Sequence, residues 1–162
     1  MSETTYRVDE IDQKILSYLV KNARMPFLEI ARECGISGAA IHQRVKKMEE
    51  AGIIDGSRMT VQEKALGFDV CCFVGIELVS TNRYHEVVEH LRQMPEVVEC
   101  HFITGQFAML IKIFCRNNEH LMDVLVNNIQ NIEGVSRTET FISLDRTIER
   151  PVYVKDKNVV SR

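Results

Sequence analysis

Apolar positions in the first third of the chain recur at helical spacing in three short segments. The first follows Asp9, whose short acceptor side chain is typical of a helix N-cap, and its apolar residues are Ile11, Ile15, Leu16, Leu19 and Val20. Pro26 ends this helix, because proline lacks the backbone donor and collides with the preceding turn. The second segment, residues 27–34, stops before Gly35, a residue type that readily takes positive φ after a helix.

The third segment, residues 38–51, carries only a thin apolar stripe. Ser37 precedes it as an N-cap, and its large apolar residues are spaced i, i+4, i+7 at Ile41, Val45 and Met48. Two short helices joined by a tight glycine turn predict a helix-turn-helix motif. We interpret the apolar residues within 53–61 as a short strand or wing that follows it.

The second half of the chain alternates between strand-like and helical patterns. The strand-like segments are 71–78, 97–104, 107–115 and 135–144, and the helical ones are 84–94 and 121–132. This βαββαβ order is that of the split βαβ, or ferredoxin-like, fold. We therefore predict an α+β protein with an N-terminal winged helix-turn-helix domain and a C-terminal ferredoxin-like domain with an antiparallel sheet. The expected boundaries are 1–61 for the first domain, 62–70 for a linker, 71–146 for the second domain and 147–162 for a tail.

The strands are apolar on both of their faces. Cys71 and Phe73 lie opposite Val74, and residues 107–111 are apolar at every position, whereas a sheet covered on one face only should alternate apolar and polar residues. Two helices cannot cover both faces. We therefore predict that a second copy of the chain covers the other face, giving a homodimer at minimum. The alternative is that residues 145–162 fold back over it with their PVYV segment.

Composition places the protein in an ordinary class. The 162 residues are 45% hydrophobic, carry a net charge of -3 and include five cysteines, which is typical of a soluble globular protein and gives no general argument for a nucleic-acid partner. No apolar run approaches the roughly 18 residues of a membrane span, and the polar N-terminus has no secretory signal pattern. We expect a cytoplasmic protein with reduced thiols and no membrane partner.

The charge is distributed unevenly around the third helix. Residues 37–48 hold three cations, one histidine and no acid. With the apolar stripe facing inward, small and polar residues face outward, and in this motif the N-terminal part of the second helix contacts base edges. Glutamine pairs with adenine, while Arg and Lys bind phosphates. We therefore predict contacts to double-stranded DNA from Ser37, Ala39, His42, Gln43, Arg44, Lys46 and Lys47.

A simpler interpretation of the same helix stays open. Cationic helix faces are commonly just solvated, and Lys46 can pair with Glu50 at i, i+4 for a few tenths of a kcal/mol. The glycine turn, the preceding short helix and the absence of acids on the outward face together favour DNA binding over this alternative.

Three stretches in this region carry a resemblance to a known family: VDEIDQKIL, NARMPFLEIARECGIS and RVKKMEEAGII. In this order they resemble the N-terminal helix-turn-helix of the leucine-responsive regulatory protein/AsnC family, the feast/famine transcription regulators. The resemblance continues through the βαββαβ half and covers roughly residues 8–150. It implies a transcription regulator that bends or wraps DNA, that assembles as a dimer or as an octamer made of four dimers, and that frequently takes a free amino acid as effector.

The resemblance also points to an effector loop. Family members often hold the ammonium group of the amino acid with the acids of a Gly-Asp-x-Asp sequence after the second sensor strand. The corresponding residues here are Thr104, Gly105, Gln106, Phe107 and Ala108, so both acids are absent. The amide of Gln106 binds an ammonium group less well than a carboxylate does. Gly105 therefore has two interpretations, as part of an effector site or as a hairpin glycine.

We expect no cofactor, no metal site and no enzymatic activity. Cys100, His101, Cys115 and His120 fit no usual zinc spacing, and no set of nucleophile, base and orienting acid can be assigned. The main prediction is a DNA-binding transcription regulator modulated by a small metabolite such as an amino acid. The alternative is an amino-acid or metabolite sensing module whose main output is oligomeric assembly or DNA architecture.

Overall fold

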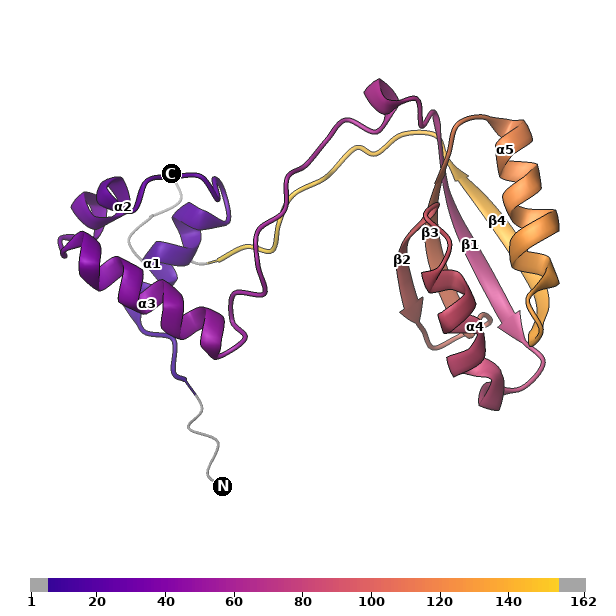
Figure 1. Cartoon of the computed structure of the whole chain (residues 1–162), viewed down its shortest axis with the longest axis horizontal. Coiled ribbons are helices and arrows are strands. Elements are labelled where there is room, and N and C mark those ends of the chain that lie inside the picture. Colours follow the sequence, from indigo (N-terminus) through magenta and orange to yellow (C-terminus); the bar gives the residue numbers. More distant parts are fainter. Residues whose placement is uncertain (1–5, 155–162) are drawn as a thin grey trace. The chain divides into compact units, whose positions relative to one another are not determined.

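The computed structural model describes residues 6–154, and it divides the chain into two compact units (Figure 1). Among the described residues, one unit consists of residues 6–59 together with residues 148–154, and the other runs from Thr60 to Thr147. The connector expected at 62–70 belongs to the second unit. Glu63 is fixed there by Arg146, whose Nη1 and Nη2 each donate to one carboxylate oxygen over 3.1 Å.

The first unit is a bundle of three helices: α1 (Glu10–Leu19), α2 (Phe27–Cys34) and α3 (Gly38–Glu50). The predicted boundaries follow from caps that the structure confirms. Asp9 and Asp12 form a capping box at the start of α1, and Gly35 has φ 68° after α2. The Ser37 hydroxyl accepts a hydrogen bond from the Ala40 N–H at the start of α3. The buried core of this unit comprises Ile15, Ile30, Ala31, Ile41, Val45 and Met48.

The strand expected after α3 is absent, since residues 53–61 contain no strand. The N–H groups of Ile53 and Ile54 both donate to the Met48 carbonyl, so they close the end of α3 and are not available to a strand ladder. Gly56 follows with a φ of 146°, a backbone conformation that residues other than glycine rarely adopt.

The second unit has the predicted βαββαβ order, which is confirmed. Its strands are β1 (Val70–Leu78), β2 (Val97–Phe102), β3 (Met109–Cys115) and β4 (Val135–Ser143). They pair antiparallel in the order β2-β3-β1-β4. The α-helices are α4 (Tyr84–Arg92) and α5 (Asn118–Asp123), and α5 continues as a π-turn, η3 (Val124–Asn128), and a 3-10 turn, η4 (Ile129–Asn131). Two further 3-10 turns are η1 (Lys64–Leu66) and η2 (Thr81–Arg83).

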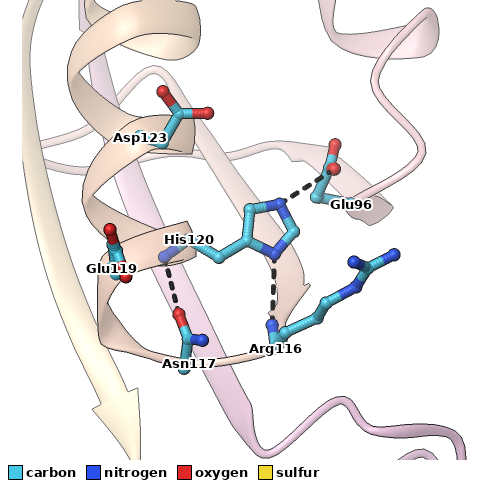
Figure 2. A pocket seen from close by; sticks show the side chains of 6 residues that line it. All are labelled: Glu96, Arg116, Asn117, Glu119, His120 and Asp123. Atoms are coloured by element: carbon cyan, nitrogen blue, oxygen red, sulfur yellow. Dashed lines mark hydrogen bonds and ion pairs between the residues drawn. The ribbon is translucent and has the colours of Figure 1, made fainter.

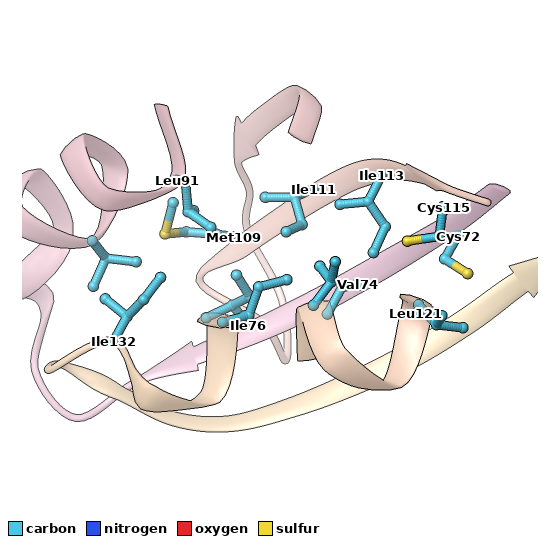
Figure 3. Packing of buried hydrophobic residues seen from close by; sticks show 13 residues of the cluster. Cys72, Val74, Ile76, Leu91, Met109, Ile111, Ile113, Cys115, Leu121 and Ile132 are labelled. Atoms are coloured by element: carbon cyan, nitrogen blue, oxygen red, sulfur yellow. The ribbon is translucent and has the colours of Figure 1, made fainter. Parts of the chain in front are cut away.

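Both α-helices cover the same face of the sheet, and the core lies between these two layers (Figure 3). Burial alternates strictly along β3, where every second residue from Met109 to Cys115 is buried. The core comprises Cys72, Val74, Ile76, Val87, Leu91, Met109, Ile111, Ile113, Cys115, Leu121, Val124, Ile129 and Ile132. No helix within residues 6–154 combines the length and apolar character that crossing a membrane requires.

The opposite face of the sheet, which we call the open face, carries an apolar patch beside charged residues such as Lys112 and Glu139. It carries Cys71 and Phe73 on β1, Phe114 on β3 and Phe141 on β4, which the strand register brings side by side. Phe141 is 45% exposed. In the described part of the tail, residues 148–154 group with the helical unit, and residues 151–153 are exposed. Residues 155–162, the rest of the tail that was the alternative cover, lie outside the described residues.

Candidate nucleic-acid interface and effector region

The helix α3 presents two different surfaces. Its predicted inward stripe is confirmed, because Ile41, Val45 and Met48 are all buried against α1 and α2. The side opposite this stripe is exposed and holds five of the predicted DNA contacts: Ala39, His42, Gln43, Lys46 and Lys47. The thin apolar stripe therefore anchors the helix while leaving its small and cationic residues accessible.

The start of α3 lies close to α2, and two contacts set its position. An added Cβ at Gly38 would lie 3.1 Å from Leu28 Cδ2, so a larger residue there would require the exposed Leu28 side chain to shift by a few tenths of an ångström. The imidazole of His42 lies 6.0 Å from the Phe27 ring, measured between centroids. The sequence pattern named Phe27 and Leu28 only as apolar positions of the second helical segment, without a contact to α3.

The two lysines of this surface are only weakly engaged. Lys46 Nζ lies 3.8 Å from Glu50 Oε1, as the alternative interpretation expected, but both side chains are about two-thirds exposed. Such a pair contributes on the order of 0.5 kcal/mol and is screened by salt. Within the described part of the chain, Lys47 has no ion-pair partner. Both cations are therefore available to an anionic partner at little energetic cost.

Arg44 behaves differently from these lysines. Its Nη1 lies 2.7 Å from Asp9 Oδ2 and 2.8 Å from Asp12 Oδ1. The hydrogen bonds to the carboxylates of Asp12 and Asp9 raise the pKa of Arg44 further above its ordinary value. Burial alone would raise the pKa of Asp9, but hydrogen bonds from the Asp12 backbone and from Arg44 outweigh it and lower that pKa. The Arg44 side chain, which the sequence predicts to contact a phosphate, is thus directed toward α1.

The signal for this contact was present in the helix pattern. Arg44 follows Ile41 by three positions and precedes Val45, so it flanks the inward stripe. Asp12 is only 1% exposed, and a buried carboxylate requires a charged or hydrogen-bonding partner.

The predicted effector loop is the hairpin between β2 and β3. Thr104, Gly105 and Gln106 are exposed, and Gly105 has φ 125°, which supports its interpretation as a turn glycine. Both backbone polar groups of Ala108 are used, since its N–H donates to the Ile76 carbonyl and its carbonyl accepts from the Ile103 N–H. The loop therefore offers a ligand the Gln106 amide, the Thr104 hydroxyl and backbone groups near Gly105.

A shallow pocket of about 390 Å³ lies at the other end of the same hairpin (Figure 2). It is lined by Glu96, Arg116, Asn117, Glu119, His120 and Asp123. His120 Nδ1 accepts the Arg116 N–H over 3.2 Å, and its Nε2 lies 3.3 Å from a Glu96 carboxylate oxygen. The sequence pattern singled out His120 only as a poor zinc ligand. Within residues 6–154 no group of three or more His, Cys, Asp or Glu residues is arranged to hold a metal ion.

Two family models match the chain over the two units. Residues 8–55 match a winged helix-turn-helix DNA-binding model, and residues 71–153 match the Lrp/AsnC ligand binding domain. The chain belongs to the Lrp/AsnC family. The resemblance drawn from the three sequence stretches is therefore confirmed, and so is the α+β class with its helix-turn-helix and antiparallel-sheet domains.

Individual members of the Lrp/AsnC family are similar over nearly their whole length. The regulatory protein AsnC of Haemophilus influenzae is 41% identical over 147 residues, which is 91% of this chain and 98% of that protein. The HTH-type transcriptional regulator LrpA of Pyrococcus horikoshii is 36% identical over 139 residues, or 86% of this chain and 98% of that protein. This chain is accordingly a DNA-binding transcription regulator of the Lrp/AsnC type.

Solved structures share the same architecture. The structure of Escherichia coli AsnC, at 42% identity, covers 91% of this chain with 99% of its own length and gives a TM-score of 0.86. A transcriptional regulator from Neisseria meningitidis, solved in complex with L-Met, covers 89% of this chain with 94% of its own length at 20% identity and a TM-score of 0.85. At that identity the likeness concerns the fold alone.

Proposed function

We propose that this Lrp/AsnC protein reads double-stranded DNA with α3, as a homodimer or an octamer of four dimers, and responds to a free amino acid. The observation that carries the DNA contact is the pair of surfaces on α3, one buried and one exposed. Ser37 and Ala39 let the helix start approach a groove floor, His42 and Gln43 meet base edges, and Lys46 and Lys47 bind phosphates.

The open face of the sheet supports the proposed dimer. Its aromatic residues, including Phe73, Phe114 and Phe141, are brought together by the register of three adjacent strands. A twofold axis through such a face buries the same patch on both copies, which is the commonest arrangement in soluble oligomers. Two recognition helices in successive major grooves of one DNA face then lie roughly 34–36 Å apart.

The DNA contact can be tested by selecting bound fragments from random duplexes and titrating the selected site by fluorescence anisotropy at increasing salt. Lys46→Ala and Lys47→Ala are expected to lower the salt slope by about 0.9 for each phosphate that the variant no longer binds. Gln43→Ala is expected to relax the preference at one base pair by about 1–3 kcal/mol. Lys64→Ala, which removes the same charge from the other unit, is the matched control and should keep the wild-type slope. An unchanged slope in both Lys46→Ala and Lys47→Ala would contradict the assignment.

We further propose that the amino acid binds at the hairpin of residues 104–108. Two solved structures with this fold are complexes with L-methionine: the transcriptional regulator from Neisseria meningitidis and a feast or famine regulatory protein from Mycobacterium tuberculosis. In this chain the exposed amide of Gln106 replaces a carboxylate, so we expect weaker binding of the ammonium group than an acidic loop provides.

Calorimetry with each free amino acid tests the effector. A heat of binding that Gln106→Ala removes, and that the exposed control Gln93→Ala retains, supports the site. No heat with any amino acid would contradict it. A protein that binds an amino acid and assembles, but shows no preference among DNA sequences, would instead favour the sensing-module function.

A further inference from the structure

Arg44 lies on the edge of the surface that α3 presents to solvent. Its side chain is 29% exposed, compared with 66% for Lys46 two residues later. It projects toward the N-terminus of α1, where Asp9 and Asp12 form the capping box. The recognition helix is thus connected to another helix of the same unit by a polar contact as well as by its apolar stripe.

The hydrogen bonds of this contact engage one terminal nitrogen of the guanidinium and both oxygens of the buried Asp12 carboxylate. The two hydrogens on Arg44 Nη1 go to Asp9 Oδ2 and Asp12 Oδ1, over 2.7 and 2.8 Å. The second oxygen of Asp12 accepts from the Tyr6 hydroxyl over 2.9 Å and from the Asp9 N–H over 3.1 Å. Tyr6, Asp9, Asp12 and Arg44 therefore form one network, which we call the Arg44 brace.

Releasing Arg44 to a phosphate would leave Asp12 as a buried carboxylate without its cation, which is strongly unfavourable. Releasing Lys46 from Glu50 is easy by comparison, because that pair is exposed and its atoms are 3.8 Å apart. The lysines of α3 are therefore more readily available to a phosphate than Arg44 is.

We infer that Arg44 is a positioning residue, which fixes the rotation of α3 against α1 through Asp9 and Asp12 and makes no phosphate contact. This inference rests on the proposed role of α3 as the DNA-reading helix. It replaces the phosphate contact that the sequence predicts for Arg44. Gln43 is its neighbour in the chain, so a small rotation of α3 moves the amide of Gln43 relative to the base edges while the lysines still reach the flexible phosphate backbone.

Asp9→Asn provides the sharpest test. Asparagine caps helices as well as aspartate does, so the start of α1 is preserved while one of the two charges that hold Arg44 is removed. Neutralising an acid on a DNA-binding unit should by general electrostatics tighten binding to every duplex. A weakened brace should instead lower the ratio of selected-site to unselected-duplex affinity by roughly tenfold, the size of one mispositioned base contact. Glu29→Gln, an exposed acid of α2, makes the same charge change away from the brace and should keep the ratio.

Arg44→Met completes the experiment, with anisotropy titrations of the full-length protein at several salt concentrations. If Arg44 acts through the brace, Arg44→Met keeps the wild-type salt slope on unselected duplex but lowers the ratio of selected-site to unselected-duplex affinity. Lys46→Ala, in contrast, lowers the salt slope by about 0.9. A slope that falls in Arg44→Met as it does in Lys46→Ala, or a ratio in Asp9→Asn equal to that in Glu29→Gln, overturns the inference. If circular dichroism shows that Arg44→Met does not fold, Asp9→Asn decides alone. A wild-type protein without any DNA preference would refute the proposed function itself.

Discussion

The ring of Phe107 lies directly against the α-carbon of Gly75. A Cβ added to Gly75 would fall 2.6 Å from both Cγ and Cδ2 of Phe107, and the Phe107 and Phe141 rings form an edge-on pair with centroids 6.3 Å apart. Gly75 lies in the centre of β1, while Phe107 belongs to the hairpin where we place the effector. The glycine thus makes room for an aromatic side chain that connects this hairpin to the open face of the sheet.

Gly75→Ala is expected to lower the free energy of unfolding by about 1–3 kcal/mol, because the new methyl group overpacks the site and displaces the Phe107 ring. Urea unfolding of the full-length protein measures this effect. The double variant Gly75→Ala with Phe107→Ala removes the clash, so its loss should be smaller than the sum of the two single losses. Additive losses would show that the two residues do not compete for the same space.

Phe141→Glu is expected to dissociate the proposed dimer. An unpaired carboxylate buried in such an interface typically opposes association by about 3–5 kcal/mol, which is more than a hundredfold in Kd, and twofold symmetry introduces it twice. Val126→Glu is the matched control, since Val126 has a similar exposure of 48% but lies on the helical layer. Sedimentation velocity should show a monomer for Phe141→Glu and a wild-type profile for Val126→Glu. A dimer that persists in Phe141→Glu places the interface elsewhere.

The sequence predicts the elements of this protein well where a local rule decides them. Asp9, Ser37 and Gly35 end or begin helices through their own side chain or φ value, so the helix-turn-helix follows from residues close in the chain. The alternation of buried residues along β3 follows from strand geometry in the same way. The resemblance to the Lrp/AsnC family then extended the fold prediction from these local elements to most of the chain.

Contacts between residues distant in the chain were harder to predict. The sequence assigned Arg44 to a phosphate, and only the packing of α1 beside α3 brings Asp12, 32 positions earlier, within 2.8 Å of its guanidinium. The apolar Ile53 and Ile54 suggested a strand, but their N–H groups close the end of α3. Phe107 was placed in the candidate effector loop, and its contact with Gly75 depends on the register of the folded sheet.

Two cysteines of the core are expected to resist alkylation in the folded protein. Burial raises the pKa values of Cys72 and Cys115 to about 11, so at pH 8 only roughly one thiol in a thousand is ionised, and neither side chain is accessible. Iodoacetamide treatment followed by peptide mass mapping should leave both unmodified in buffer and modify both in urea. The exposed Cys100 serves as the internal control and should react first. Native modification of Cys72 at the rate of Cys100 would contradict the packing of this core.

The ionisation of Asp9 should stabilise the fold in a pH-dependent way. Its pKa is held below the ordinary value of 3.8 in the folded protein, so the carboxylate contributes its full stabilisation above about pH 4 and loses it as the pH falls through the lower, folded-state pKa. Asp9→Asn has no such carboxylate, and we expect the difference in unfolding free energy between wild type and this variant to be constant from pH 7 to about pH 5 and to shrink below pH 4. Urea unfolding followed by helical circular dichroism between about pH 7 and pH 2.5 measures that difference, and comparing the two proteins cancels the titration of the other acids. A difference that stays constant down to about pH 2.5, or that grows as acid is added, would mean that Asp9 does not titrate against Arg44 in the folded protein.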